Sequence, residues 1–140
     1  MTEREMGDLC RDQRPVTLPV TASVKEACCR MRDHRVGAVL VTRDGRLVGI
    51  FTGRDAVNRV LAEGRNPART SLGAVMTAAP STVAPKTTAI EALRLMRDGG
   101  CRHLPIVESG KLKGIVSRGD FRGLEQARLD EETGLWERIW

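Results

Sequence analysis

An internal duplication constrains the fold of this chain more than any other feature of its 140 residues. Shifting the sequence by 65 positions aligns residues 15–55 with residues 80–120 without a gap, and 12 of the 41 aligned residues are identical. Chance would give about two or three identities at ordinary composition. A lead-in also repeats with a one-residue slip, because MGDLC (6–10) resembles LGAVM (72–76). The chain therefore consists of two copies of one structural unit.

Both copies predict the same order of elements: strand, helix, strand, strand, helix. Short extended pieces are expected at 16–18 and 82–83, next to prolines. A turn at Asp44-Gly45, or at Ser109-Gly110, separates the second and third strands. The first helix of each copy begins with a predicted capping box and carries an apolar stripe at i, i+3, i+4 and i+7. The boxes are Ser23 with Glu26 and Thr88 with Glu91, and the stripes are Val24, Ala27, Cys28, Met31 and Ala89, Ala92, Leu93, Met96.

A three-stranded unit of about 60 residues buries too little apolar surface to be stable alone. We therefore expect an α+β fold in which two interdependent modules pack sheet against sheet around a pseudo-twofold axis. The modules are predicted over 5–66 and 67–125, with the crossover at 63–70, and a helical tail is predicted over 126–140. That tail carries Trp136 and Trp140, and it is either a helix packed on its own domain or a clasp in a homodimer.

Composition and charge limit the possible partners. The chain is 41% hydrophobic and 29% charged, as expected of a globular protein, and no apolar run is long enough to cross a membrane. Because residues 1–10 contain no apolar run either, a cytoplasmic location is expected. The net charge of +5 combines a basic body with an acidic tail, which indicates either a polyanionic partner or only a solvated surface. Nucleic acid is disfavoured as that partner, because the few aromatic residues form no stacking array.

The sequence gives little support to metal binding or catalysis. Its four cysteines form no CxxC pair and no histidine stands at ligand spacing, so a metal site is not expected. No residue at suggestive spacing would activate a thiol, and the chain is therefore predicted not to be an enzyme and to need no catalytic cofactor.

A hydroxyl residue and an aspartate three positions later recur at the end of each copy, in GIFTGRD (49–55) and GIVSRGD (114–120). One interpretation is a helix cap, in which the hydroxyl caps the helix and the aspartate complements its dipole. The other is a ribonucleotide site: a helix start suits a phosphate, a carboxylate can accept both ribose hydroxyls, and a glycine lets a flat ring approach the backbone. The recurrence on a basic body favours the second interpretation.

The duplicated unit, its G-h-h-[ST]-x-x-D ending and the segment RHLPIVESGKLKGIVS resemble a tandem pair of CBS domains, also called a Bateman module, over about residues 5–125. The resemblance implies a cleft on each side of the pair that binds an adenosine derivative: AMP, ADP, ATP, an NAD-type dinucleotide or S-adenosylmethionine. Binding would regulate a partner protein that the sequence does not identify. Stand-alone CBS pairs also form homodimers, which the resemblance implies here.

The resemblance assigns expected roles to individual residues. Asp55 and Asp120 correspond to ribose-binding aspartates, and Thr52 and Ser117 lie near the phosphate. The first copy has Gly37 and Ala38 where the second has Arg102 and His103, so the two clefts are not expected to be equivalent. The full set of expected nucleotide-binding residues is Thr17, Thr52, Arg54, Asp55, Thr82, Arg102, His103, Pro105, Ser117, Arg118 and Asp120.

Two functions follow as hypotheses. The first is a non-catalytic module that senses an adenosine nucleotide and passes that state to a partner protein. The second is a ligand-free structural adaptor, whose fold serves oligomerisation and whose repeated hydroxyl and aspartate are only caps.

Overall fold

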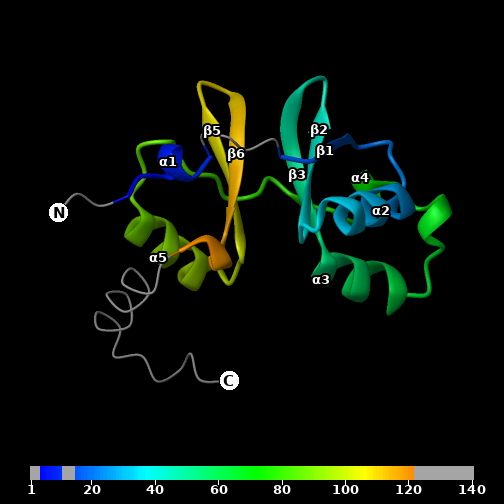
Figure 1. Cartoon of the computed structure of the whole chain (residues 1–140). Helices are drawn as coiled ribbons and strands as arrows, with labels where there is room; N and C mark the ends of the chain where they lie inside the picture. The colour runs from blue at the N-terminus through cyan, green and yellow to red at the C-terminus, as the bar shows by residue number, and fades with distance from the viewer. Residues whose placement is uncertain (1–3, 11–14, 122–140) are drawn as a thin grey trace, which may run out of the picture. The chain divides into compact units, whose positions relative to one another are not determined.

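The computed structural model describes residues 4–10 and 15–121. The predicted tail at 126–140, with Trp136 and Trp140, lies outside the described residues. The chain divides into two compact units, one of which contains both the dark blue α1 and the yellow-to-orange hairpin in Figure 1. We call residues 15–81 the repeat-one unit, and residues 4–10 together with 82–121 the repeat-two unit.

The repeat-one unit is built on a four-stranded sheet with the order β1-β2-β3-β4. Its strands are β1 (Thr17–Pro19), β2 (Ala38–Arg43), β3 (Arg46–Thr52) and β4 (Thr77–Ala78). β1 runs parallel to β2, and the other neighbours are antiparallel. Its helices are α2 (Val24–His34), the continuous pair α3 (Gly53–Asp55) and η1 (Ala56–Leu61, a π-helix), the 3₁₀ turn η2 (Pro67–Arg69), and α4 (Leu72–Val75).

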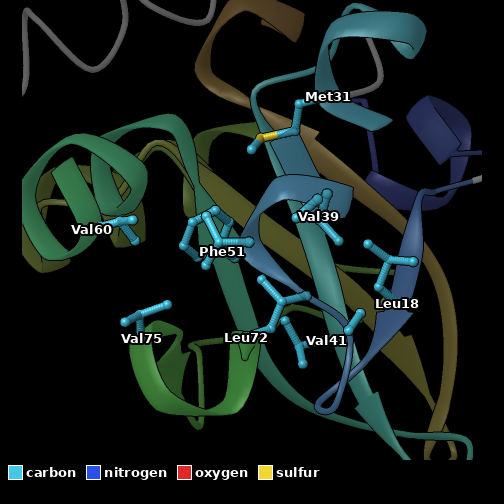
Figure 2. Packing of buried hydrophobic residues seen from close by; sticks show 11 residues of the cluster. Leu18, Met31, Val39, Val41, Phe51, Val60, Leu72 and Val75 are labelled. Carbon is cyan, nitrogen blue, oxygen red and sulfur yellow. The ribbon is translucent and has the colours of Figure 1, made fainter. Parts of the chain in front are cut away.

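The repeat-one core is aliphatic apart from one aromatic ring. Phe51 of β3 is fully buried at its centre and is surrounded by side chains from the sheet and from its helices (Figure 2). The predicted stripe of α2 faces this core, with Val24, Ala27 and Met31 buried and Cys28 partly buried. Packing of this stripe confirms the helical periodicity that the sequence predicted.

The repeat-two unit repeats this plan with fewer hydrogen-bonded strands. It contains α1 (Met6–Cys10), α5 (Ala89–Gly99), β5 (His103–Glu108), β6 (Lys111–Ser117) and the 3₁₀ turn η3 (Arg118–Asp120). β5 and β6 form an antiparallel hairpin, and the expected first strand is reduced to a parallel bridge between Val83 and Ile106. All four predicted stripe residues of α5 are buried.

The sequence correctly predicted both hairpin turns and the N-cap residues of α2 and α5. Asp44, Gly45, Ser109 and Gly110 all have positive φ angles, as the predicted two-residue hairpin turns require. Ser23 and Thr88 accept a hydrogen bond from the backbone N–H three residues later. Among the described residues, neither Glu26 nor Glu91 returns the second bond of a capping box, so that half of the prediction is wrong.

The lead-in segments are exchanged between the two repeats. α1 precedes the first repeat in sequence, yet it packs on the second, where Met6 is fully buried and its N–H donates to Thr87 O at 2.8 Å. α4 precedes the second repeat, yet Leu72 and Val75 are buried in the repeat-one core. Each lead-in therefore belongs to the unit whose core its apolar side chains fill, and not to the repeat that follows it in the sequence.

The two compact units differ in their bounds from the two sequence repeats. The predicted ranges 5–66 and 67–125 are contiguous, whereas the repeat-two unit takes its lead-in from the start of the chain. The predicted crossover at 63–70 also belongs to the repeat-one unit, because Thr70 O accepts from Val24 N at 2.9 Å. Among residues 4–10 and 15–121, no helix has the length and apolar character that crossing a membrane requires.

Candidate functional site

The sequence-predicted site residues gather at one corner of each unit, where the last strand of a hairpin turns into a helical segment. In the repeat-one unit Gly53 N donates to Gly37 O at 3.2 Å, and in the repeat-two unit Arg118 N donates to Arg102 O at 3.0 Å. These residues are equivalent under the 65-residue repeat. The two corners therefore share a backbone geometry and differ in their side chains.

At the repeat-one corner, Asp55 closes a capping box with Thr52. Its Oδ2 accepts from Thr52 N at 3.0 Å and from Thr52 Oγ1 at 3.2 Å, and Thr52 Oγ1 accepts from Asp55 N at 3.2 Å. The residue is only 8% exposed. The cap interpretation therefore accounts for Oδ2 of Asp55 completely.

Two residues that sequence reasoning missed engage the other oxygen of Asp55. Oδ1 lies 3.6 Å from Nε of Arg59 and accepts a hydrogen bond from Thr77 Oγ1 at 3.5 Å. Arg59 also donates through Nη1 to Met76 O at 2.9 Å and to Val75 O at 3.4 Å. The i, i+4 spacing of Asp55 and Arg59 is the sequence signal that would have revealed the ion pair.

At the repeat-two corner, Asp120 has the same cap but different surroundings. Its Oδ2 accepts from Ser117 N at 2.7 Å and from Ser117 Oγ at 3.2 Å. Asp120 is exposed. Its Oδ1 has no hydrogen-bond donor among the described residues.

Three arginines belong to the same corner as this second aspartate. Arg102 and Arg118 are adjacent through their backbone hydrogen bond, and Arg4 donates from Nη2 to Asp120 O at 3.4 Å. Arg4 is 116 positions from Asp120 and reaches it only because α1 belongs to this unit, so no sequence pattern could indicate it. A corner that combines three arginines with one aspartate suits an anionic ligand that also carries hydroxyl groups.

His103 is half-buried at the start of β5, directly opposite Ser117 in the register of the hairpin. Burial lowers the pKa of its imidazole, Asp120 opposes that effect, and Arg102 adds to it. Desolvation penalises the charged form of histidine, which explains the direction. A neighbouring anion would favour the charged form again.

The remaining predicted residues take less central positions. Thr17 and Thr82 are exposed on the first extended piece of each repeat, and neither hydrogen-bonds to its aspartate in the part of the chain described. Arg54 is exposed in α3. Pro105 is buried opposite Ile115, and its carbonyl accepts from Val83 N at 3.0 Å, so it supports the sheet instead of presenting a side chain.

The role given to the glycine of GIFTGRD is wrong. A Cβ atom at Gly49 would lie 2.9 Å from Cγ of Met76 and 3.1 Å from Thr77 O. The open side of the glycine is thus filled by the side chain and backbone that follow α4, not left for a flat ring. Gly49 permits β4 to pair closely with β3.

The cysteines Cys28, Cys29 and Cys101 are partly buried. Burial raises the pKa of the Cys28 thiol, with Cys29 adding to the effect, and burial likewise raises the pKa of Cys101. Such thiols stay protonated, whereas reactive cysteines need a stabilised thiolate. Residues 4–10 and 15–121 contain no group of three metal-ligating side chains.

Comparison with known proteins agrees with the duplicated architecture. The model of the CBS domain matches twice, over residues 6–62 and 72–125. The chain belongs to the CBS-domain family. It contains two CBS modules, and its fold is of mixed α and β structure.

Relatives of this CBS protein include a much longer chain and one of similar length. The CBS domain-containing protein CBSCBSPB1 of Arabidopsis thaliana is 40% identical over 107 residues, which cover 76% of this chain and 20% of that protein. This chain thus spans about a fifth of the length of that plant relative. YhcV of Bacillus subtilis, another CBS domain-containing protein, is 36% identical over 105 residues, which cover 75% of this chain and 74% of that protein.

A solved structure with the same fold contains a nucleotide. The CBS domain protein PAE2072 from Pyrobaculum aerophilum, complexed with AMP, matches with a TM-score of 0.80 and 26% identity, over 91% of this chain and 98% of that one. The likeness in fold is therefore close, although three residues in four differ.

Proposed function

We propose that this CBS protein is a non-catalytic regulatory module of the cytoplasm that binds an adenosine-containing nucleotide at the repeat-two corner. The single observation that supports this most is that Asp120 is exposed, with no described donor to its Oδ1, at a corner that also contains Arg102 and Arg118. A carboxylate of this kind accepts hydrogen bonds from ribose hydroxyls, and guanidinium groups bind phosphate. AMP, which PAE2072 is complexed with, has both groups.

The proposal assigns roles within the repeat-two unit. Asp120 receives the ribose hydroxyls, while Arg102, Arg118 and His103 face the phosphate. Thr82 contributes a hydroxyl at the adenine end, and Ser117 keeps Asp120 in place through its N–H. The bound state is then read by a partner protein, which the chemistry of the corner does not identify.

A thermal-melt screen tests the proposal. AMP, ADP, ATP, NAD(H) and S-adenosylmethionine are each added to the full chain and to Asp120→Asn. A ligand present at about a hundred times its dissociation constant adds about 2.7 kcal/mol of stability, which raises the melting temperature by several degrees. We expect a rise with at least one ligand, lost in Asp120→Asn.

Asp98→Asn is the matched control, because Asp98 is exposed on α5 and pairs with the neighbouring Arg97. It removes the same charge from the same unit and should keep the ligand-induced rise. A chain that none of the five ligands stabilises would contradict nucleotide sensing and favour the structural adaptor. A full rise in Asp120→Asn would contradict the site.

Self-association belongs to the same proposal and rests on a separate observation. Val57 and Leu61 lie about one turn apart on η1 and are 54% and 64% exposed. A large apolar pair in water is a feature of contact surfaces. We propose a homodimer that buries this pair. Light scattering should show a lower mass for Leu61→Glu than for the wild type, whereas the control Asn58→Glu should keep the mass of the wild type. An unchanged mass for Leu61→Glu would contradict a dimer formed through this pair.

A further inference from the structure

Asp55 and Asp120, which are equivalent under the repeat, differ in how many acceptor positions of their carboxylates remain unoccupied. A carboxylate accepts at about four lone-pair positions. Both positions on Oδ2 are used in each copy, by the backbone N–H and the hydroxyl of the cap residue. The difference therefore lies entirely on Oδ1.

In the repeat-one unit, Oδ1 of Asp55 is also engaged, by one hydrogen bond and one ion pair. Thr77 Oγ1 donates at 3.5 Å, and Nε of Arg59 lies 3.6 Å away as an ion pair. Asp55 is 8% exposed, so a ribose would have to displace one of these groups to approach it. In the repeat-two unit, Asp120 is exposed with Oδ1 unused by any described donor.

Arg59 is held from two sides, which makes its displacement unfavourable. Its Nη1 donates to the carbonyl of Met76 at 2.9 Å and to that of Val75 at 3.4 Å. These carbonyls end α4, so they would lose their partner if the guanidinium moved away. Met76 is also packed against Gly49, which fixes the position of the acceptor.

The second repeat has no counterpart of this arginine. The residue equivalent to Arg59 under the 65-residue shift is Leu124, which carries no charge. Leucine cannot form an ion pair with Asp120, wherever its side chain lies. The sequence alone therefore shows that Asp55 has an arginine four residues later and that Asp120 does not.

We propose that Arg59 closes the ribose position of the repeat-one unit by occupying Asp55, so that each chain binds one nucleotide, at Asp120. The inference rests on the proposed function and adds its stoichiometry and the residue that sets it. Arg59 acts through Asp55 as a positioning residue, and it is a built-in competitor for the ligand hydroxyls.

Isothermal titration of the full chain with AMP tests this inference. The wild type should bind one AMP per chain, Asp55→Asn should bind one with unchanged affinity, and Asp120→Asn should lose at least tenfold in affinity. Arg59→Leu, which gives repeat one the residue of repeat two, should bind two AMP per chain. The second binding event should disappear in Arg59→Leu combined with Asp55→Asn.

A milder variant guards against misfolding of Arg59→Leu. Thr77→Val removes one donor from Oδ1 of Asp55 and keeps the shape of the side chain, so it should allow weak binding of a second AMP. A ligand-free thermal double-mutant cycle of Asp55→Asn and Arg59→Leu should in addition show that the two substitutions are not additive. Additive effects would mean that Arg59 and Asp55 do not interact, and this would overturn the inference.

The outcomes of the titration separate the inference from the function on which it rests. Two AMP per wild-type chain, or one AMP per chain in both Arg59→Leu and Thr77→Val, would overturn the inference and leave nucleotide binding intact. If the wild type bound no AMP and Arg59→Leu bound one, the result would support closure of the repeat-one position by Arg59 and contradict the site at Asp120. No binding to any variant would overturn the proposed function, and the inference with it.

Discussion

The side chain of Met76 lies directly over the Cα atom of Gly49, two residues that belong to different repeats of the sequence and to the same unit of the structure. Their contact ties the end of α4 to β3. It also places the carbonyl of Met76 where Arg59 can reach it. The glycine of the repeated motif thus serves packing in the repeat-one unit.

Gly49→Ala should destabilise the protein because the new methyl group would overlap with Met76. A Cβ atom would lie 2.9 Å from Cγ of Met76, and overpacking of this kind costs about 1–3 kcal/mol. Urea unfolding measures the loss. Gly53→Ala is the control, since a Cβ atom there meets nothing within 4 Å; equal stability of Gly49→Ala and the wild type would contradict the contact.

The exchange of lead-in segments predicts a crossed pattern of local stability. Met6 and Leu72 are both fully buried, and replacing such a side chain by alanine costs about 2–5 kcal/mol. Met6→Ala should speed amide hydrogen exchange in α5, β5 and β6, whereas Leu72→Ala should speed it in α2, β2 and β3. Loss of protection in the contiguous repeat that follows each lead-in would contradict the exchange.

The repeated pattern explains why most of the fold could be predicted. Helix stripes, cap hydroxyls and hairpin turns are local, so Met31 and Gly45 reveal their environments through their neighbours in sequence. The exchange of lead-ins could not be predicted, because Met6 and Leu72 suit either core. Only the tertiary arrangement decides which core each one fills.

The candidate site likewise has features that the local sequence predicts and features that depend on tertiary packing. The caps formed by Asp55 and Asp120 were visible as a motif, but their different exposure was not. Arg59 and Thr77 contact the carboxylate of Asp55 in one unit, whereas Arg4 donates to the backbone carbonyl of Asp120 in the other. Thr77 and Arg4 are far from the motif in sequence, and tertiary packing alone brings them to it.

His103 should make stability depend on pH. Burial lowers its pKa in the folded state, so just below the usual histidine pKa of about 6.5 the unfolded chain binds a proton that the folded chain does not. The free energy of unfolding should therefore fall as pH decreases through that range. Urea unfolding at pH 7.5 and pH 5.5 measures the change.

His103→Gln should reduce this loss of stability on acidification, because the unfolded chain then gains no proton at position 103. His34→Gln, at the exposed end of α2, is the matched control and should retain it. The explanation would be wrong if the wild type and His103→Gln lost the same stability between the two pH values.

The central claim, that one nucleotide binds at the repeat-two corner, is tested most directly by titrating ¹⁵N-labelled protein with AMP and following each backbone amide. We expect the amides of Arg102, His103, Ser117, Arg118 and Asp120 to shift with a single dissociation constant, while those of Gly53, Arg54 and Asp55 stay in place. Shifts confined to the Gly53–Asp55 corner, or no shifts at any AMP concentration, would contradict the account.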